Sequence, residues 1–232
     1  MKFTLLIILF FISPIISAQN INQLDTNGKR HGIWKKNFEG TNEVRYEGEF
    51  SHGKEIGLFK FYKYLNKKSV LTATKQFNEN NNIADVKFLS SRGKTISEGK
   101  MNGKLYVGKW IYYHNNSTNI MTNETYNDEG KLQGKRFVYY EHGQIAEEAN
   151  YINGSEEGVS NWYSKNGNIV KAFIYENNEL HGLAKYYDEE GIMLVEGSYK
   201  RGKKTGVWKY YTNGILVKKK DFTYVPKYKK KQ

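Results

Sequence analysis

The chain contains no cysteine in its 232 residues. Disulfide bonds, a lipid anchor on an N-terminal cysteine and metal sites built with thiolates are therefore excluded. An apolar stripe with the 3.6-residue period of a helix is also missing, and glycine recurs too often for long helices, with 22 residues in the chain. These absences exclude disulfide-stapled folds and disfavour helical ones.

Histidine is scarce, and its five copies show no helical metal-ligand spacing. His31 and His181 occupy the same place in two units of a repeat, about six units apart. The other three, His52, His114 and His142, fall in predicted turns. We therefore expect the histidines not to converge, and we predict no metal site.

Other signatures of catalysis are missing too. Paired carboxylates occur, but they fall in turns or on opposite faces of a strand, where they cannot flank one substrate. These pairs are Glu147-Glu148, Glu156-Glu157 and Glu189-Glu190. The sequence contains no nucleophile elbow, phosphate loop or dinucleotide fingerprint. We predict a protein without enzymatic activity, catalytic residues or cofactor.

What the sequence does contain is a repeat of about 24 residues. A glycine that precedes a strand-like segment marks most units, and an aromatic or methionine side chain closes each one. The marking residues are Gly32, Gly57, Gly108, Gly134, Gly158, Gly182 and Gly206, with Ala84 in the same place in one degenerate unit. Two markers that keep one period indicate a stacked array.

Each unit reads as a β-hairpin. Large side chains stand two and four residues after the glycine, as in Trp208 and Tyr210, and such alternation places both on one face of a strand. Asn-Gly pairs such as Asn213-Gly214 favour two-residue hairpin turns. The predicted fold is all-β: an elongated antiparallel sheet of about eight stacked hairpin repeats over residues 27–222.

Two units depart from the pattern. The unit after Gly134 carries one extra residue, and we expect a β-bulge at Lys135–Arg136 to restore its register. The unit 84–101 lacks the glycine and the paired aromatics. We expect it to be the weakest unit and the place where the array bends.

The termini differ from the repeats. Residues 1–18 combine Lys2 with a short apolar run and a Ser17-Ala18 cleavage site, which predicts a signal peptide cut near Ala18. The run is too short to span a membrane comfortably. Residues 19–26 form a lead-in and residues 223–232 a basic tail. We expect an exported protein, in the periplasm or at the cell surface.

Aromatic side chains are the feature with binding potential, at 15% of the residues. The first aromatic of each pair is expected in the core, so the second must face the other way. A candidate binding strip for an extended partner consists of Tyr62, Tyr113, Tyr140, Tyr163, Tyr187 and Tyr211. Ordinary cross-strand pairing on the outer face is the alternative explanation of this row.

About half of the net charge of +12 lies at the C-terminal end. The lysines there are Lys218, Lys219, Lys220, Lys227, Lys229, Lys230 and Lys231. Lysines on the last strand are expected to protect an exposed sheet edge. The alternative is contact with an anionic surface, either lipid head groups or envelope glycan. Nucleic acid is not expected as a partner of an exported chain.

Two stretches of the chain are similar to a known repeat family. They read Asn-Asn-Glu-Leu-His-Gly-Leu-Ala-Lys-Tyr-Tyr from Asn177 and Lys-Arg-Gly-Lys-Lys-Thr-Gly-Val-Trp-Lys-Tyr-Tyr-Thr-Asn-Gly from Lys200. Both resemble the bacterial variant of the MORN repeat, which recurs in proteins labelled YwqK-type antitoxins. The resemblance implies an elongated sheet of hairpins that binds proteins or membranes.

From these observations we predict a non-enzymatic, exported scaffold that binds another protein, with an antitoxin-like or immunity role. The alternative is a cell-envelope module that binds glycan or anionic lipid through its aromatic residues and its lysine-rich tail. The sequence leaves the oligomeric state open.

Overall fold

The computed structural model describes residues 21–223, which form eighteen strands and no helix. The first nine are β1 (Gln23–Leu24), β2 (Arg30–Asn37), β3 (Val44–Ser51), β4 (Lys54–Leu65), β5 (Lys68–Phe77), β6 (Ile83–Leu89), β7 (Thr95–Asn102), β8 (Leu105–Tyr113) and β9 (Ile120–Tyr126). The others are β10 (Gly134–Tyr139), β11 (Ile145–Ile152), β12 (Ser155–Glu156), β13 (Gly158–Tyr163), β14 (Ile169–Glu176), β15 (Glu179–Tyr187), β16 (Met193–Lys200), β17 (Lys203–Thr212) and β18 (Ile215–Asp221).

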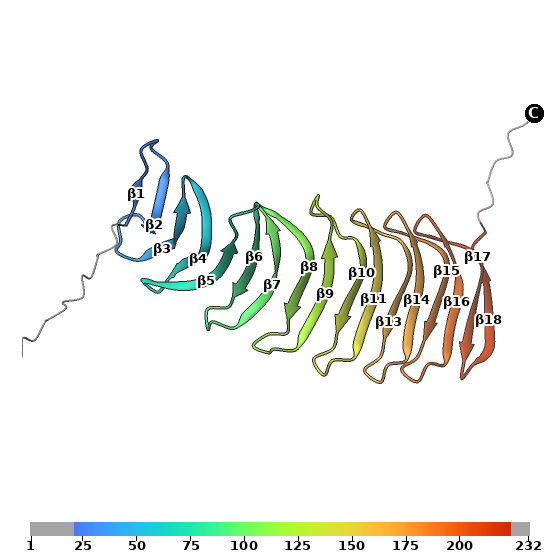
Figure 1. Ribbon diagram of the computed structural model, residues 1–232. Coiled ribbons are helices and arrows are strands. Elements are labelled where there is room, and N and C mark those ends of the chain that lie inside the picture. The colour runs from blue at the N-terminus through green and yellow to red at the C-terminus, as the bar shows by residue number, and fades with distance from the viewer. Residues whose placement is uncertain (1–20, 224–232) are drawn as a thin grey trace, which may run out of the picture.

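The strands form one elongated, open antiparallel sheet in chain order (Figure 1). Each strand pairs with the next along the chain, and β11 pairs with both β12 and β13. The predicted array of hairpins is confirmed. The lead-in contributes the short strand β1, which pairs with β2. The predicted signal peptide, residues 1–18, and all but the first residue of the predicted tail lie outside the described residues.

Two kinds of turn alternate along the sheet. Two-residue turns such as Asn153-Gly154 and Asn213-Gly214 have positive φ at both positions, as Asn-Gly pairs allow. The turn at Asn166-Gly167 differs from the prediction, because it is a longer turn in which Ser164 N donates to Asn168 O at 2.7 Å. Turns of this longer kind join most glycine-bearing strands to the return strands that follow, whereas β4–β5 and β17–β18 are joined by the two-residue turns Asn66-Lys67 and Asn213-Gly214.

The repeat glycine bends its strand. At Gly206 the φ angle is +60°, and between the pairs Glu196–Lys209 and Ser198–Thr205 one residue of β16 faces three residues of β17. This bulge lets the ring of Trp208 lie flat against Gly197 of β16, where a side chain would overlap it. Trp208 Nε1 donates to Ser198 O at 3.2 Å. Trp110 and Gly99 repeat the arrangement in an earlier unit.

The core therefore lies on one face of the sheet, in two clusters. One surrounds Trp110 and includes Ala84, Val86 and Met101. The other surrounds Trp208 and includes Phe173 and Ala184. Both tryptophans are fully buried, so the rings fill the bends of the strands rather than the space between two layers.

The degenerate unit is part of the first cluster. Ala84 and Val86 are buried, and β6 pairs with β5 and β7 over its length. The pairing of β5 with β6 contains no register shift, because Ala84 does not introduce the bulge that glycine introduces elsewhere. The unit thus belongs to the array, and its low stability stays a prediction.

The bulge that we expected at Lys135–Arg136 is wrong. The pairing of β10 with β11 is regular from Gly134 to Val138 and shifts only between Val138 and Tyr139. Arg136 consequently stands two residues after the repeat glycine, in the place of Trp208. This shift falls between the fourth and fifth residues after the glycine, as it does in the units of Gly158, Gly182 and Gly206, so the unit carries no extra residue.

Candidate binding face

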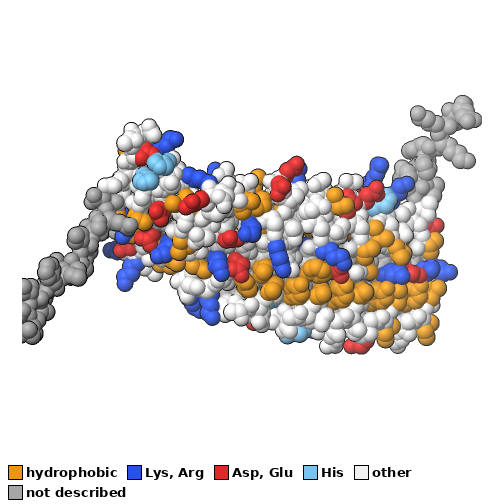
Figure 2. All heavy atoms as spheres, viewed as in Figure 1, with side chains coloured by type: hydrophobic (Ala, Val, Ile, Leu, Met, Phe, Trp, Pro, Cys, Tyr) orange, Lys and Arg blue, Asp and Glu red, His pale blue; other side chains and the backbone are white. Residues whose placement is uncertain are grey.

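The face opposite the tryptophans carries a regular row of tyrosines. A register shift beside each of these tyrosines places it directly opposite an aliphatic or methionine residue of the return strand, on the same face. The pairs are Tyr62–Leu71, Tyr113–Ile120, Tyr139–Ile145, Tyr163–Ile169, Tyr187–Met193 and Tyr211–Leu216. We call these twelve residues the Tyr–aliphatic band. Figure 2 shows a band of hydrophobic side chains across the C-terminal half of the sheet, beside lysines and glutamates.

Most of the band tyrosines are held by a carboxylate of the preceding return strand. Tyr62 Oη donates to Glu47 Oε1 at 2.7 Å, and Tyr211 Oη donates to Glu196 Oε1 at 2.8 Å. Glu196 Oε1 also forms an ion pair with Lys209, whose Nζ lies 2.8 Å away. The same contact recurs at Tyr113–Glu98 and Tyr163–Glu148. These bonds fix the hydroxyls while the rings stay half-buried.

The contacts also fix the protonation states. Burial and the hydrogen bond to Glu47 raise the pKa of Tyr62 to about 12. The hydrogen bond from Tyr62 holds the pKa of Glu47 below its usual value. Glu196 has a lowered pKa because it accepts from Lys209 and Tyr211. Near neutral pH the row thus combines neutral phenols with ionised carboxylates.

Five of the six predicted tyrosines belong to the band, and Tyr140 does not. Tyr139 is the fifth residue after Gly134, as Tyr211 is after Gly206, so it takes the place that we had assigned to Tyr140. Tyr140 lies in the turn, where its Oη donates to Tyr163 O at 2.7 Å and its ring stacks on His142. The hydroxyl contacts are cross-strand pairs of the kind we considered as the alternative, and a binding role for the row stays a prediction.

A polar cluster separates the two apolar clusters of the core face. Arg136 donates to Glu124 at 3.3 Å and to Glu147 at 2.8 Å, and Glu124 is buried. The next unit has the fully buried Ser160 in the tryptophan position, and its hydroxyl donates to Glu156. Sequence reasoning missed this cluster, although an arginine two residues after a repeat glycine was its visible signal.

We expect Glu156→Gln to stabilise the protein at neutral pH. Burial is the main cause that raises the pKa of Glu156 above its usual value of 4.5. The folded state therefore binds the proton more tightly, and stability falls as pH rises from about 4.5 through the raised pKa. Glutamine at position 156 stays neutral, so this loss of stability does not occur, and its side-chain oxygen can still accept the hydrogen bond from the Ser160 hydroxyl. Thermal melts between pH 4 and 8 should show a Tm about 1–3 °C higher at pH 7 and no gain at pH 4, with Glu157→Gln as the neighbouring control.

The expectation that the histidines do not converge is wrong for two of them. The rings of His31 and His52 lie 4.7 Å apart, and His52 Nδ1 is 2.7 Å from Asp25 Oδ2. Neighbouring turns on the same edge bring them together, since Gly53 N donates to Arg30 O. Among residues 21–223 no group of three or more acidic or histidine side chains could hold a metal ion.

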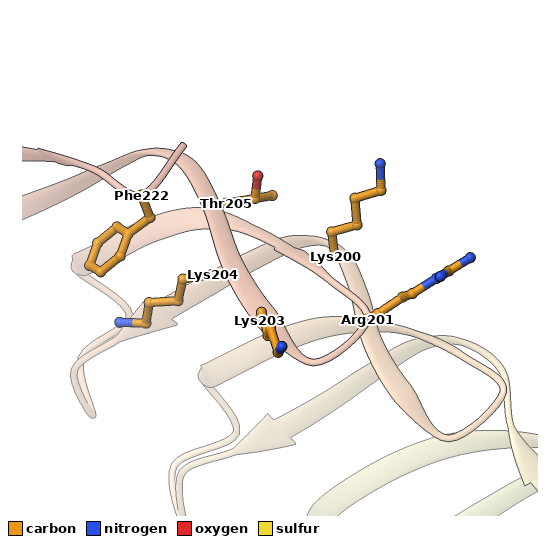
Figure 3. Close-up of a pocket in the computed structure, with 6 residues that line it drawn as sticks. All are labelled: Lys200, Arg201, Lys203, Lys204, Thr205 and Phe222. Carbon is orange, nitrogen blue, oxygen red and sulfur yellow. The ribbon is translucent and has the colours of Figure 1, made fainter. Parts of the chain in front are cut away.

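Lysine and arginine gather at the C-terminal end of the sheet. Lys200, Arg201, Lys203 and Lys204 surround the turn between β16 and β17, and a hollow of about 480 Å³ lies between them and Phe222 (Figure 3). Lys204 Nζ lies 4.0 Å from the centre of the Trp208 ring. Lys218, Lys219 and Lys220 lie on the exposed strand β18. Lys227, Lys229, Lys230 and Lys231 lie outside the described residues.

The described part of the chain has no helix long and apolar enough to cross a membrane. A hollow of about 550 Å³ lies over β6 and β7, and its lining includes Val86, Gly99 and Ile111 together with charged side chains. Four of these form ion pairs, because Lys87 Nζ lies 2.9 Å from Glu98 Oε2 and Lys100 Nζ lies 2.6 Å from Asp85 Oδ1.

Comparison with known families supports the repeat. The model of the MORN repeat variant matches residues 132–153 and 180–201. These segments contain β10, β11 and β16 and all but the first residue of β15, together with the turns between them. No curated protein sequence matches the chain. The chain is therefore similar to the MORN repeat variant in two separate segments, and the strands around them continue the same hairpin array.

Proposed function

We propose that the protein is a non-enzymatic, exported scaffold that binds another protein across the Tyr–aliphatic band. The observation that carries this proposal is the exposed apolar surface that recurs at the same place in successive hairpins. Ile120, Ile169 and Leu216 each expose about two fifths of their surface. Contiguous apolar rows on a protein surface mark interaction sites.

A second apolar row runs parallel to the band. It consists of the residue after the repeat glycine in four units, Leu58, Val159, Leu183 and Val207, all about half exposed. Between the two rows lie charged side chains of both signs, such as Glu196, Lys185 and Lys209. Two apolar lines beside a mixed charged line suit a protein surface with the same alternation.

The chemistry of this face favours protein over the envelope alternative. Glycan recognition needs free hydrogen-bond groups beside the aromatic rings, but Glu47 and Glu196 already accept from Tyr62 and Tyr211. An anionic lipid surface would be attracted by lysine and repelled by the glutamates in the same row. The lysine-rich end of the sheet is the surface to which the lipid or glycan alternative applies.

The finer role that we propose is that of an immunity-type factor, which would neutralise a partner protein outside the cytoplasm. The support is the resemblance to the repeats of antitoxin-labelled proteins together with the predicted signal peptide. A partner seated on the band would meet preorganised side chains, because the carboxylate contacts already fix most of the tyrosines. Preorganisation lowers the ordering cost of binding.

The double variant Ile120→Asp with Ile169→Asp tests this proposal. Both side chains are exposed, so folding should survive while two charges enter the band. We expect affinity capture from source cells to recover one stoichiometric protein with the wild-type chain, and at least tenfold less of it with the variant.

The matched control is Ile152→Asp, which puts the same charge at an equally exposed aliphatic residue outside the band. This control should capture the partner as the wild type does. Equal loss with Ile152→Asp, or undiminished capture by the band variant, would contradict binding at the band.

A further inference from the structure

The last described strand, β18, presents an open sheet edge. It pairs with β17 on one side, and no strand within residues 21–223 covers the other side. All seven of its residues are exposed, with Ile215 at 70% and Val217 at 60%. An open edge of this length is a template for one more strand.

The direction of the backbone groups follows from one hydrogen bond. Phe222 N donates to Gly206 O of β17 at 2.9 Å. Alternate residues of a strand direct their N–H and C=O groups to opposite sides. The backbone N–H and C=O of Lys220 therefore point toward β17. The backbone groups of Lys219 and Asp221 point away from the sheet.

No negatively charged side chain of the described residues stands opposite Lys219 of β18 on a neighbouring strand, whereas Glu196 stands opposite Lys209 on the preceding strands. Across the outer face the paired residues are Lys185, Glu196, Lys209 and Lys219 in order from β15 to β18. Glu196 stands between two lysines, and Lys209 Nζ contacts it at 2.8 Å. Lys219 instead stands beside Lys209, and like charges in directly opposed positions are unfavourable.

We propose that β18 receives an extended segment of a partner protein as a further strand, with carboxylate side chains opposite Lys218, Lys219 and Lys220 and an apolar side chain opposite Val217. A carboxylate beside Lys219 continues the alternation of Lys185, Glu196 and Lys209. The partner class rests on the proposed function, whereas the edge strand shares only Leu216 with the Tyr–aliphatic band.

The charge of the edge also selects against other occupants. Two copies of β18 paired with each other would place lysine against lysine, so the same side chains that admit an acidic strand oppose self-association. Lys204 and Lys220 lie within 5.4 Å of the Phe222 ring at the end of the strand. They extend the positive surface past the edge, beside the hollow in Figure 3.

A synthetic peptide tests the proposal on the full mature chain. The probe is a fluorescent nine-residue peptide with three consecutive glutamates flanked by valine and threonine. The first control is the same peptide with alternate backbone amides methylated, so that its charge is kept while its edge hydrogen bonds are lost. We expect methylation to weaken binding at least about tenfold, since several hydrogen bonds disappear together.

Two substitutions of Lys219 separate the contribution of its backbone N–H to peptide binding from that of its charge. Lys219→Ala removes the charge and should weaken the unmethylated peptide about threefold, as loss of one cross-strand ion pair predicts. Lys219→Pro also removes the outward N–H, which an edge strand tolerates, and should weaken it at least tenfold. Thermal melts must show that both variants remain folded.

Amide hydrogen exchange supplies a readout that simple attraction of charges would not change. The peptide should slow exchange at Lys219 and Asp221 and leave Lys218 and Lys220, which already face β17, nearly unchanged. Equal affinity for the methylated peptide, or binding to anionic vesicles that Lys219→Pro does not weaken, would overturn strand addition in favour of plain electrostatic attachment. Because Ile120 and Ile169 of the band lie on β9 and β14 and not on β18, Ile120→Asp with Ile169→Asp should bind the peptide normally.

Discussion

Replacing Gly197 with valine should lower the free energy of unfolding by about 3 kcal/mol or more. Gly197 has an ordinary extended φ, so the loss comes from space and not from backbone strain. A side chain there would overlap the Trp208 ring, which fills the bend of β17. Either the ring leaves its place or β16 and β17 move apart, and both break the second apolar cluster.

Denaturant unfolding of a double-mutant cycle checks this prediction. Gly197→Val should cost much less in a Trp208→Ala background, because the clash that it creates is with the ring. Gly99→Val should behave in the same way with Trp110, whose ring lies against Gly99. A cost for Gly197→Val that is equal with and without Trp208 would contradict the packing role of these glycines.

Arg136→Ala should cost about 3–5 kcal/mol, because it removes one partner of a buried charge cluster. The side chain of Glu124 is 9% exposed and that of Glu147 is 24% exposed, and both would lose their cation. The exposed pair Lys135–Glu148 provides a contrast. Lys135→Ala should change stability by less than about 1 kcal/mol, as is usual for a lysine at the surface.

A compensated variant checks the cause of that loss. Arg136→Met combined with Glu124→Gln and Glu147→Gln removes the charges together and keeps an acceptor for Tyr126, whose hydroxyl donates to Glu124 at 2.6 Å. We expect this variant to recover most of the stability lost in Arg136→Ala. A compensated variant as unstable as Arg136→Ala would show that the arginine acts through its packing and not through its charge.

Spacing along the chain was sufficient to predict the architecture. The marking glycines and the alternation after them predicted hairpins, because a period of about 24 residues leaves room for two strands and two turns. The structural role of Gly48, Gly99 and Gly197 could not be read in the same way. They do not recur in every unit. Glycine is needed at these positions because the ring of a residue on the next strand lies directly against the backbone there.

Register was harder to predict than fold. Aligning aromatic residues placed a bulge at Lys135–Arg136 and moved Tyr140 into the row of tyrosines. The glycine is the true anchor, because its bend fixes which side chain enters the core, whether that is Trp208 or Arg136. The aliphatic partners of the tyrosines were missed for a related reason, since they depend on the register shift beside each tyrosine.

Contacts between units were the least accessible to sequence. His31 and His52 come from different hairpins, and only the hydrogen bond between their neighbouring turns brings them together. Half of the candidate site was therefore predictable: the orientation of the tyrosines followed from alternation. The carboxylates that hold them, such as Glu47 and Glu196, required the register.

Site-specific photo-crosslinking in source cells tests binding at the band most directly. A benzophenone side chain replaces Tyr187, a band tyrosine for which no hydroxyl hydrogen bond is seen within residues 21–223, and in a second strain it replaces Ile152 outside the band. We expect one discrete protein adduct from position 187, its loss when Ile120→Asp and Ile169→Asp are added, and little or no adduct from position 152. An adduct that forms at position 152 and not at position 187 would contradict binding at the band.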